Sequence, residues 1–318
     1  MVQHETYFES FDGTKLYLYR WAPEGKPLKA VVYIAHGMAE HALRYRRLAD
    51  KLTGSGVEVW ASDQRGHGRT ADLKVNGPDR GGLFGHCADG NGFTRVTKDI
   101  NGIIKEIQKN RPKTPIFLLG HSWGSFIAQN YIEEYSGNSL INGCILSGTK
   151  GPGDMMIKAG LPFITLFSFF KGQRKGSLYI KSLADGPYIK PFLPNRTEFD
   201  WLSRDEEEVD KYIADPHCGF LCSTGFYRDL AKILARIHRS DKMEKIDCYL
   251  PLYVLSGSDD PVGAMGASPT ILVNEYRHLG IKDLEFVLYP GARHEVFNET
   301  NREEVTDNLL SWIFKRCE

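Results

Sequence analysis

The sequence predicts an α/β fold, with helices on both faces of a mostly parallel central sheet and a mostly helical insertion in the second half. In the first half, short apolar segments alternate with segments of helical periodicity, which is typical of a parallel sheet. The alternation lapses at residues 149–247, where Gly-Pro steps, an aromatic block and an acidic segment replace it, and it resumes at Pro251. We therefore expect a core of residues 1–148 and 248–318, interrupted by an insertion at 149–247.

The first half contains most of the expected elements. Asp12-Gly13 is a turn signal between two aromatic-rich segments, which predicts an opening antiparallel hairpin from residues 7–11 and 15–21. Apolar segments typical of strands covered on both faces lie at 30–35, 57–61, 115–119 and 141–146. Helical spacing of apolar residues predicts helices at 41–52, 93–111 and 126–135. The glycine-rich segment 73–92 is expected to be a surface loop.

The alternation of the first half returns after the insertion. Strands are expected at 252–255 and 284–288, and helices at 267–279 and 302–314. Polar residues follow both of these strands. Because the carboxyl ends of parallel strands meet at one edge of a sheet, these polar residues are expected at the same edge as those of the first half.

Composition excludes several classes of function. Forty basic residues balance forty acidic residues, so no net positive field favours nucleic acid. The six cysteines are scattered, which at this chain length predicts free thiols and no disulfide framework. A metal at His217, Cys218 and Cys222 is disfavoured, because zinc-binding pairs usually come with a second pair downstream. We expect no metal and no cofactor.

Two segments bear on location. The first ten residues lack a basic stretch followed by an apolar core, so no signal peptide is expected and a cytoplasmic location follows. The longest apolar block, 159–170, is shorter than the ~20 residues that a spanning helix needs. The block is apolar enough to line a channel or contact a lipid surface, and a packed helix explains it equally well.

One pentapeptide organises the expected site. Gly120-His121-Ser122-Trp123-Gly124 stands between an apolar strand and a helix-compatible segment. A serine at such a strand-to-helix turn is held in a strained backbone that exposes its hydroxyl. Glycines two residues before and after it are required, because the chain approaches itself closely there. Ser122 is therefore the candidate nucleophile.

The partners that a serine nucleophile needs follow two later strands. Asp259 and Asp260 end the strand at 252–255, where one carboxylate can orient a histidine, and His294 follows the strand at 284–288. We choose Asp260, which gives the chain order Ser122, Asp260, His294 expected for this sheet architecture. His294 would accept the Ser122 proton as Ser122 attacks an acyl carbonyl, and Asp260 would hold the imidazole.

The oxyanion formed in that attack needs hydrogen-bond donors. The backbone N–H groups of Trp123, directly after the nucleophile, and of Met38, after His36-Gly37, occupy the two expected places. His36, His67 and His121 are interpreted as loop-shaping or core residues.

Taken together, the motifs resemble those of the α/β-hydrolase superfamily over nearly the full chain. They are similar to the branch of monoacylglycerol lipases and bacterial lysophospholipase-like esterases, also called serine aminopeptidase-like. The resemblance is carried by the segments 36–41, 63–68, 120–124, 257–262 and 291–294, together with Arg44-Tyr45. It implies Asp260 as the acid and the insertion as a cap over the pocket.

The same resemblance implies further site residues. Glu40 and Arg44 match family residues that support the oxyanion loop or contact a glycerol-like head group. The chain departs from the family at Trp123, where methionine is common, and at Ser125, where glycine is common. Phe297 stands where monoacylglycerol lipases carry a second histidine that helps to bind glycerol, which weakens the case for strict monoglyceride specificity.

The expected function is a cofactor-free serine carboxylester hydrolase that cleaves single-chain acyl esters such as monoacylglycerols or lysophospholipids. Its partners would be a small acyl ester or lipid, with transient membrane contact through the cap, and no nucleic acid. A peptidase that removes an N-terminal residue is the alternative, with the acidic segment 205–208 holding the α-ammonium group. A catalytically idle binding module is the second alternative. The oligomeric state stays open.

Overall fold

The computed structural model describes residues 1–153 and 155–317. These residues form an eight-stranded sheet in the order β1-β2-β4-β3-β5-β6-β7-β8. β1 pairs antiparallel with β2 and β2 with β4, whereas all the later pairs are parallel. The strands are β1 (Val2–Glu9), β2 (Lys15–Ala22), β3 (Ala30–Ala35), β4 (Val57–Ser62), β5 (Ile116–His121), β6 (Gly143–Ser147), β7 (Leu252–Gly257) and β8 (Leu284–Tyr289).

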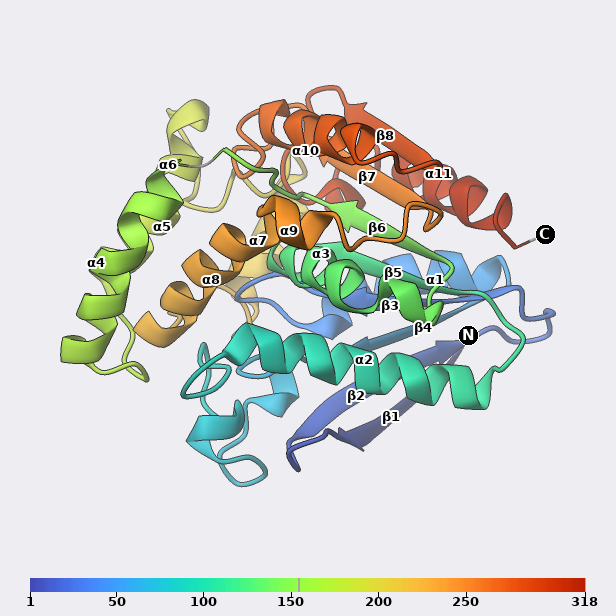
Figure 1. Ribbon diagram of the computed structural model, residues 1–318, viewed down its shortest axis with the longest axis horizontal. Helices are drawn as coiled ribbons and strands as arrows, with labels where there is room; N and C mark the ends of the chain where they lie inside the picture. Colours follow the sequence, from blue (N-terminus) through green and yellow to red (C-terminus); the bar gives the residue numbers. More distant parts are fainter. Residues whose placement is uncertain (154, 318) are drawn as a thin grey trace.

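Helices cover both faces of this sheet (Figure 1). Side chains alternate along each strand, so β5 places Leu118 in one apolar core and Phe117 and Leu119 in the other. The first core includes residues of α2 (Gly92–Asn110), α3 (Trp123–Tyr135) and α10 (Ala267–His278). The second includes residues of α1 (Arg46–Gly54) and α11 (Arg302–Phe314). The predicted mostly parallel sheet with helices on both faces is therefore confirmed.

A chain of helices connects β6 to β7 and lies beyond the arrowheads of the parallel strands, at the left of Figure 1. α8 packs against both α3 and α4, which ties this segment to the sheet. Its division from the rest at residues 148 and 248 stays a prediction. The helices are α4 (Met155–Lys171), α5 (Leu178–Ala184), α6 (Gly186–Ile189), α7 (Glu206–Ala214), α8 (Thr224–Ile237) and α9 (Ser240–Met243). Among the described residues, no helix combines the length and apolarity needed to cross a bilayer.

Two local expectations differ from the structure. The first strand begins at Val2 and ends at Glu9, because residues 10–14 form the turn, in which the Ser10 N–H donates to the Thr14 carbonyl at 2.8 Å. The segment 73–92 is only partly a surface loop, since His86 and Cys87 are buried. It folds inward because His86 Nδ1 hydrogen-bonds Ser223 Oγ at 2.9 Å, immediately before α8.

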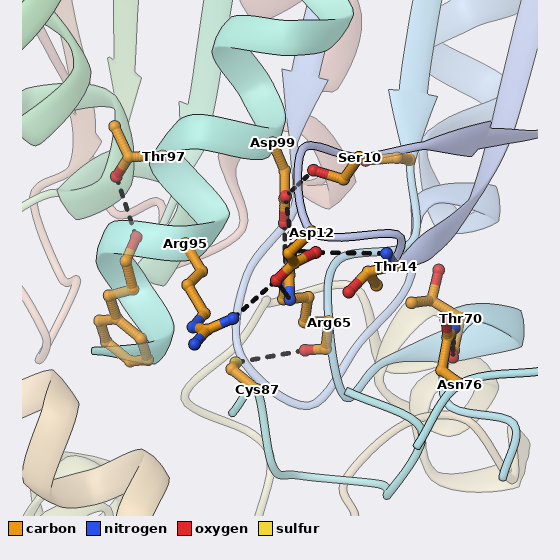
Figure 2. A network of polar contacts seen from close by, with 12 residues as sticks. Ser10, Asp12, Thr14, Arg65, Thr70, Asn76, Cys87, Arg95, Thr97 and Asp99 are labelled. Atoms are coloured by element: carbon orange, nitrogen blue, oxygen red, sulfur yellow. Dashed lines mark hydrogen bonds and ion pairs between the residues drawn. The ribbon is translucent and has the colours of Figure 1, made fainter. Parts of the chain in front are cut away.

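A buried arginine joins the hairpin turn, the segment after β4 and α2 (Figure 2). Arg65 is fully buried and pairs with two carboxylates, Asp12 at 2.8 and 2.9 Å and Asp99 at 2.6 and 2.8 Å. Asp99 also accepts from the Ser10 hydroxyl. Arg95 reaches the same Asp12 at 2.6 Å from a partly exposed position. The guanidinium thus satisfies carboxylates that would be costly to bury alone.

This network predicts a large difference between two arginine substitutions. Arg65→Met should lower the free energy of unfolding by about 3–5 kcal/mol, because it leaves the buried Asp99 carboxylate unpaired. Arg95→Met is the matched control and should cost less than about 1 kcal/mol, because its side chain is partly exposed to water. Urea unfolding followed by circular dichroism measures both. If both substitutions lowered the free energy of unfolding equally, burial of the Arg65 ion pairs would not determine how much they stabilise the protein.

Candidate active site

Ser122 lies at the sharp turn between β5 and α3. Its backbone has φ 52° and ψ −122°, a conformation that costs a non-glycine residue energy. Two glycines make the turn possible. A Cβ at Gly120 would lie 2.4 Å from the Gly124 carbonyl oxygen, and a Cβ at Gly124 would lie 2.1 Å from the Ala35 carbonyl oxygen. The local geometry is that of the elbow expected from the pentapeptide.

Asp260 and His294 form a buried pair. His294 Nδ1 lies 3.0 Å from Asp260 Oδ1, and both side chains are almost inaccessible to water. Asp260 Oδ1 also accepts from the Val262 N–H at 2.9 Å. Asp259 instead accepts from the Ser258 hydroxyl at 2.8 Å, so the structure pairs His294 with Asp260 and leaves Asp259 aside.

The pair shifts the pKa values of both members. Burial alone would raise the pKa of Asp260, but the charge and hydrogen bond of His294 outweigh it, and the pKa is lowered. Burial alone would lower the pKa of His294, but Asp260 outweighs it, and the pKa is raised above 6.5. Among the described residues, His294 Nε2 has no hydrogen-bond partner. Nε2 is therefore available to accept a hydrogen bond from a donor in the cavity.

One cavity brings the predicted residues together. Ser122, His294, Met38 and Trp123 all line it, at the carboxyl edge of the sheet. Its remaining wall comes largely from the segment between β6 and β7 and is mostly aromatic: Tyr188, Phe199, Trp201, Tyr212, Phe220 and Tyr227. No described residue of α4 is part of the wall, so the apolar block 159–170 does not line this cavity.

Glu40 and Arg44 are joined in a buried charge cluster, in which Glu40 lines the cavity and Arg44 lies behind it. A Glu40 oxygen accepts from the Gly37 N–H and, at 2.9 Å, from the Tyr45 hydroxyl. Arg44 reaches Glu40 at 2.6 Å and binds Glu295 with both terminal nitrogens at 2.6 and 2.7 Å. This geometry favours support of the loop at 37–40 over contact with a head group, because both carboxylates already occupy the guanidinium.

Electrostatics in this cluster favour the charged forms. Burial would raise the pKa of Glu295, but Arg44 outweighs burial and lowers the pKa to about 2. Burial would lower the pKa of Arg44, and the two carboxylates raise it instead. The cluster therefore carries two negative charges against one positive charge next to His294, and Glu295 and Glu40 contribute to the raised pKa of His294.

Phe297 does not lie on the cavity that Ser122 lines. Its side chain is buried in the second apolar core and borders a small separate hollow with Tyr45, His121, Glu295 and Asn298. Phe297 is therefore not positioned to contact a ligand in the Ser122 cavity.

The acidic segment 205–208 also lies away from this cavity. Asp205 caps α7 and pairs with Arg302 at 2.6 Å, while Glu208 pairs with Arg47 at 2.8 Å. The carboxylate that the insertion does supply to the cavity wall is Asp185. Burial raises the pKa of Asp185 to about 6, although the Lys181 ammonium opposes the shift.

The other histidines have local roles, as expected. His36 Nε2 accepts from the Gln64 N–H at 2.9 Å, and His121 Nδ1 meets Ser147 Oγ at 3.2 Å. Burial lowers the pKa of His67 to about 4 and that of His121 to about 3. These rings stay neutral near pH 7. His217 lies on a separate hollow with Phe84 and does not line the Ser122 cavity.

The sequence interpretation missed three residues that shape the His294 position. Glu295 directly follows His294 in the chain and binds Arg44, which anchors the histidine. Its position next to the candidate base is a signal that the sequence contained. Trp201 lies with its ring 5.2 Å from the His294 ring, which nothing in the sequence indicates. Gly148 directly follows β6 with φ 58°, and a Cβ there would lie 2.9 Å from His294 Cε1.

Gly148→Ala tests whether the imidazole position matters. The added Cβ should displace the His294 ring, and a displacement of about 1 Å can cost about 10²-fold in rate. The measurement is the second-order rate of Ser122 labelling by a fluorophosphonate probe. Gly137→Ala is the control, because a Cβ there meets no atom within 4 Å. Unchanged labelling of Gly148→Ala would contradict the predicted role.

Comparisons with known proteins cover nearly the whole chain. Residues 26–301 match the family described as "Serine aminopeptidase, S33". The chain is 30% identical over 322 residues to the monoglyceride lipase of Mus musculus, covering 96% of this chain and 88% of the mouse protein. It is 29% identical over 314 residues to the monoacylglycerol lipase of Mycolicibacterium smegmatis, covering 98% and 97% of the two chains.

A solved structure agrees with these matches. A thermostable carboxyl esterase from Bacillus coagulans, in complex with glycerol, superimposes with a TM-score of 0.88 and 26% identity, covering 100% of both chains. The resemblance expected from the motifs is confirmed. The chain belongs to the serine aminopeptidase S33 family of α/β hydrolases.

Proposed function

We propose that the protein is a serine carboxylester hydrolase that cleaves single-chain acyl esters, such as monoacylglycerols or lysophospholipids, through an acyl-enzyme on Ser122. The observation that carries the proposal is the pair of His294 and Asp260, whose atoms Nδ1 and Oδ1 lie 3.0 Å apart. The other ring nitrogen of His294, Nε2, has no partner among the described residues, and His294 lines the same cavity as the strained Ser122. The names of the mouse and mycobacterial relatives support an ester of this class.

The mechanism follows from the roles of these groups. His294 takes the proton of the Ser122 hydroxyl as the serine oxygen attacks the acyl carbonyl, and then passes it to the leaving alcohol. Asp260 holds the Nδ1 proton and stabilises the imidazolium. The backbone N–H groups of Met38 and Trp123 are the proposed donors to the oxyanion. Water then releases the acid by the same proton transfers in reverse.

The wall of the cavity supports an acyl chain as the bound group. Phe126, Leu230 and Val262 add aliphatic and aromatic surface to the aromatic wall contributed between β6 and β7. The contact with a lipid surface expected from the sequence stays a prediction, supported by the exposed Phe169 and Phe170 of α4. The cytoplasmic location stays a prediction as well.

An aminopeptidase is the second candidate, and one observation favours it. Asp185 lines the cavity and could hold an α-ammonium group. The Lys181 ammonium lies 3.9 Å from this carboxylate and competes for it, which makes amide substrates the weaker proposal.

A panel of substrates tests the proposed reaction. p-Nitrophenyl esters of graded chain length, 1-monoacylglycerol, lysophosphatidylcholine and amino-acid amides should give turnover of esters well above that of amides. Ser122→Ala should lower kcat/KM by about 10⁴-fold or more. Ser311→Ala, on the exposed face of α11, is the control. Monoacylglycerol presented as monomers and in vesicles measures any preference for a lipid surface. Ester turnover equal in Ser122→Ala and wild type would refute the proposal.

The pH dependence tests the base. Because His294 acts only when neutral and its pKa is raised above 6.5, kcat/KM should fall with decreasing pH through a midpoint above 6.5. Asp260→Asn removes the carboxylate that raises this pKa, so the midpoint should move to lower pH while kcat drops by about 10⁴-fold. Asp259→Asn should leave both quantities unchanged. A profile that did not respond to Asp260→Asn would assign the base elsewhere.

A further inference from the structure

A second cluster of potential ligand atoms lies outside the cavity, where the loop after β3 meets the turn after α7. His41 Nε2, an Asp215 carboxylate oxygen and Cys218 Sγ all lie within 4.8 Å of one another. His41 Nε2 and Asp215 Oδ2 are 2.9 Å apart. His41 lies 174 residues before Asp215 in the chain, whereas Asp215 and Cys218 share one turn, so the meeting of His41 with that turn is a product of the fold.

The surroundings hold these side chains in place. His41 is largely buried, and Asp215 is oriented by the His217 N–H, which donates to Asp215 Oδ1 at 2.8 Å. The turn itself is fixed on the loop at 37–40. The Gly219 N–H and the Tyr212 hydroxyl both donate to the Ala39 carbonyl at 2.9 Å. The side chains are therefore already ordered, and a bound ion would lose little free energy to ordering them.

The donor set is suited to zinc. An imidazole nitrogen, a carboxylate oxygen and a thiolate sulfur are all Zn²⁺ ligands, and bond lengths of about 2.0–2.3 Å in a tetrahedral site separate the donor atoms by about 3.5 Å. The donor atoms lie within 4.8 Å of one another, so the side chains close by about 1 Å to reach that spacing when the ion binds. His217 supplies a fourth donor nearby, since its Nδ1 lies 3.7 Å from Asp215 Oδ1. Its half-exposed ring offers a path from solvent.

The local charge also favours a cation. Burial raises the pKa of the Cys218 thiol. Three carboxylates, of Glu40, Asp215 and Glu295, raise it further, and one guanidinium, of Arg44, lowers it. Their sum is two negative charges. A divalent cation would balance this excess, so the protein field attracts the ion to the donor atoms.

We propose that His41, Asp215 and Cys218 form a Zn²⁺ site that clamps the turn at 215–219 onto the loop carrying Met38 and Ala39. On binding, the thiol proton of Cys218 passes to water. The proton that His41 Nε2 donates to Asp215 is also released from Nε2, and water returns a proton to His41 Nδ1, so that the imidazole stays neutral. The freed Nε2 and the carboxylate oxygen then each form a bond to the metal in place of their hydrogen bond. His41 follows the proposed oxyanion donor Met38 by three residues, and the site does not use Ser122 or His294. Zn²⁺ binding at this site can therefore be tested separately from the proposed ester hydrolysis.

Metal binding to the full chain tests the site directly. The Ser122→Ala protein should bind about one equivalent of Zn²⁺ by equilibrium dialysis with elemental analysis. Co²⁺ in place of Zn²⁺ should give a sulfur-to-cobalt charge-transfer band in the near ultraviolet, because Cys218 ligates the ion. The thermal midpoint should rise with Zn²⁺ concentration, because the ion binds the folded chain.

Substitutions separate this site from adventitious binding. Cys218→Ser and Asp215→Asn, made in the same background, should each weaken Zn²⁺ by at least about 100-fold and, for Cys218→Ser, abolish the cobalt band. Cys248→Ser, a partly buried cysteine outside the cluster, should bind as the parent does. Circular dichroism without metal confirms folding. The proposal is overturned if the parent protein gives no cobalt band, or if Cys218→Ser binds Zn²⁺ as tightly as Cys248→Ser.

Discussion

The close approach of α3 to the end of β3 is the constraint on which the rest of the site depends. Gly124 has no room for a side chain because the Ala35 carbonyl would lie 2.1 Å from its Cβ. The same contact positions two things at once. It forces Ser122 into its strained backbone, and it brings the first turn of α3 against the chain that leaves β3 and becomes the loop carrying Met38. The proposed nucleophile and the proposed oxyanion donors thus lie on either side of one backbone contact.

The buried cluster of Glu40, Arg44 and Glu295 links this loop to the opposite side of the site. Glu40 accepts from the Gly37 N–H, and Glu295 directly follows His294. Arg44 binds both, so the loop and the histidine are tied through one guanidinium. Removing one of these charged groups would leave a buried charge without a partner, which would lower the free energy of unfolding. Both carboxylates already bind the Arg44 guanidinium, so its proposed role is to support the loop.

The segment between β6 and β7 supplies much of the cavity wall, but the apolar block 159–170 within it takes no part in that wall. α4 packs on α8 along one side and leaves Phe169 and Phe170 exposed, while the cavity wall comes from the later helices and loops. The turn at 215–219 is hydrogen-bonded to Ala39, so the cavity wall and the loop carrying Met38 are in direct contact. The metal site proposed above lies at this junction, where it would replace the hydrogen bond between His41 and Asp215 by a metal link.

The sequence alone determined the parallel sheet, the Ser122 elbow and the candidates Asp260 and His294. These predictions rest on apolar periodicity, on the spacing of glycines and on the common edge of parallel strands. Such patterns can be recognised in the sequence without knowing how distant segments pack. The sequence could not decide between loop support and substrate contact for Glu40 and Arg44, nor place Phe297, Asp185 and the acidic segment 205–208. Those outcomes depend on which side chains meet across long stretches of chain. Only the tertiary structure brings Glu295 to Arg44, Gly148 to His294 and His41 to Cys218, because such contacts arise from packing between distant segments and leave no periodic signal in the sequence.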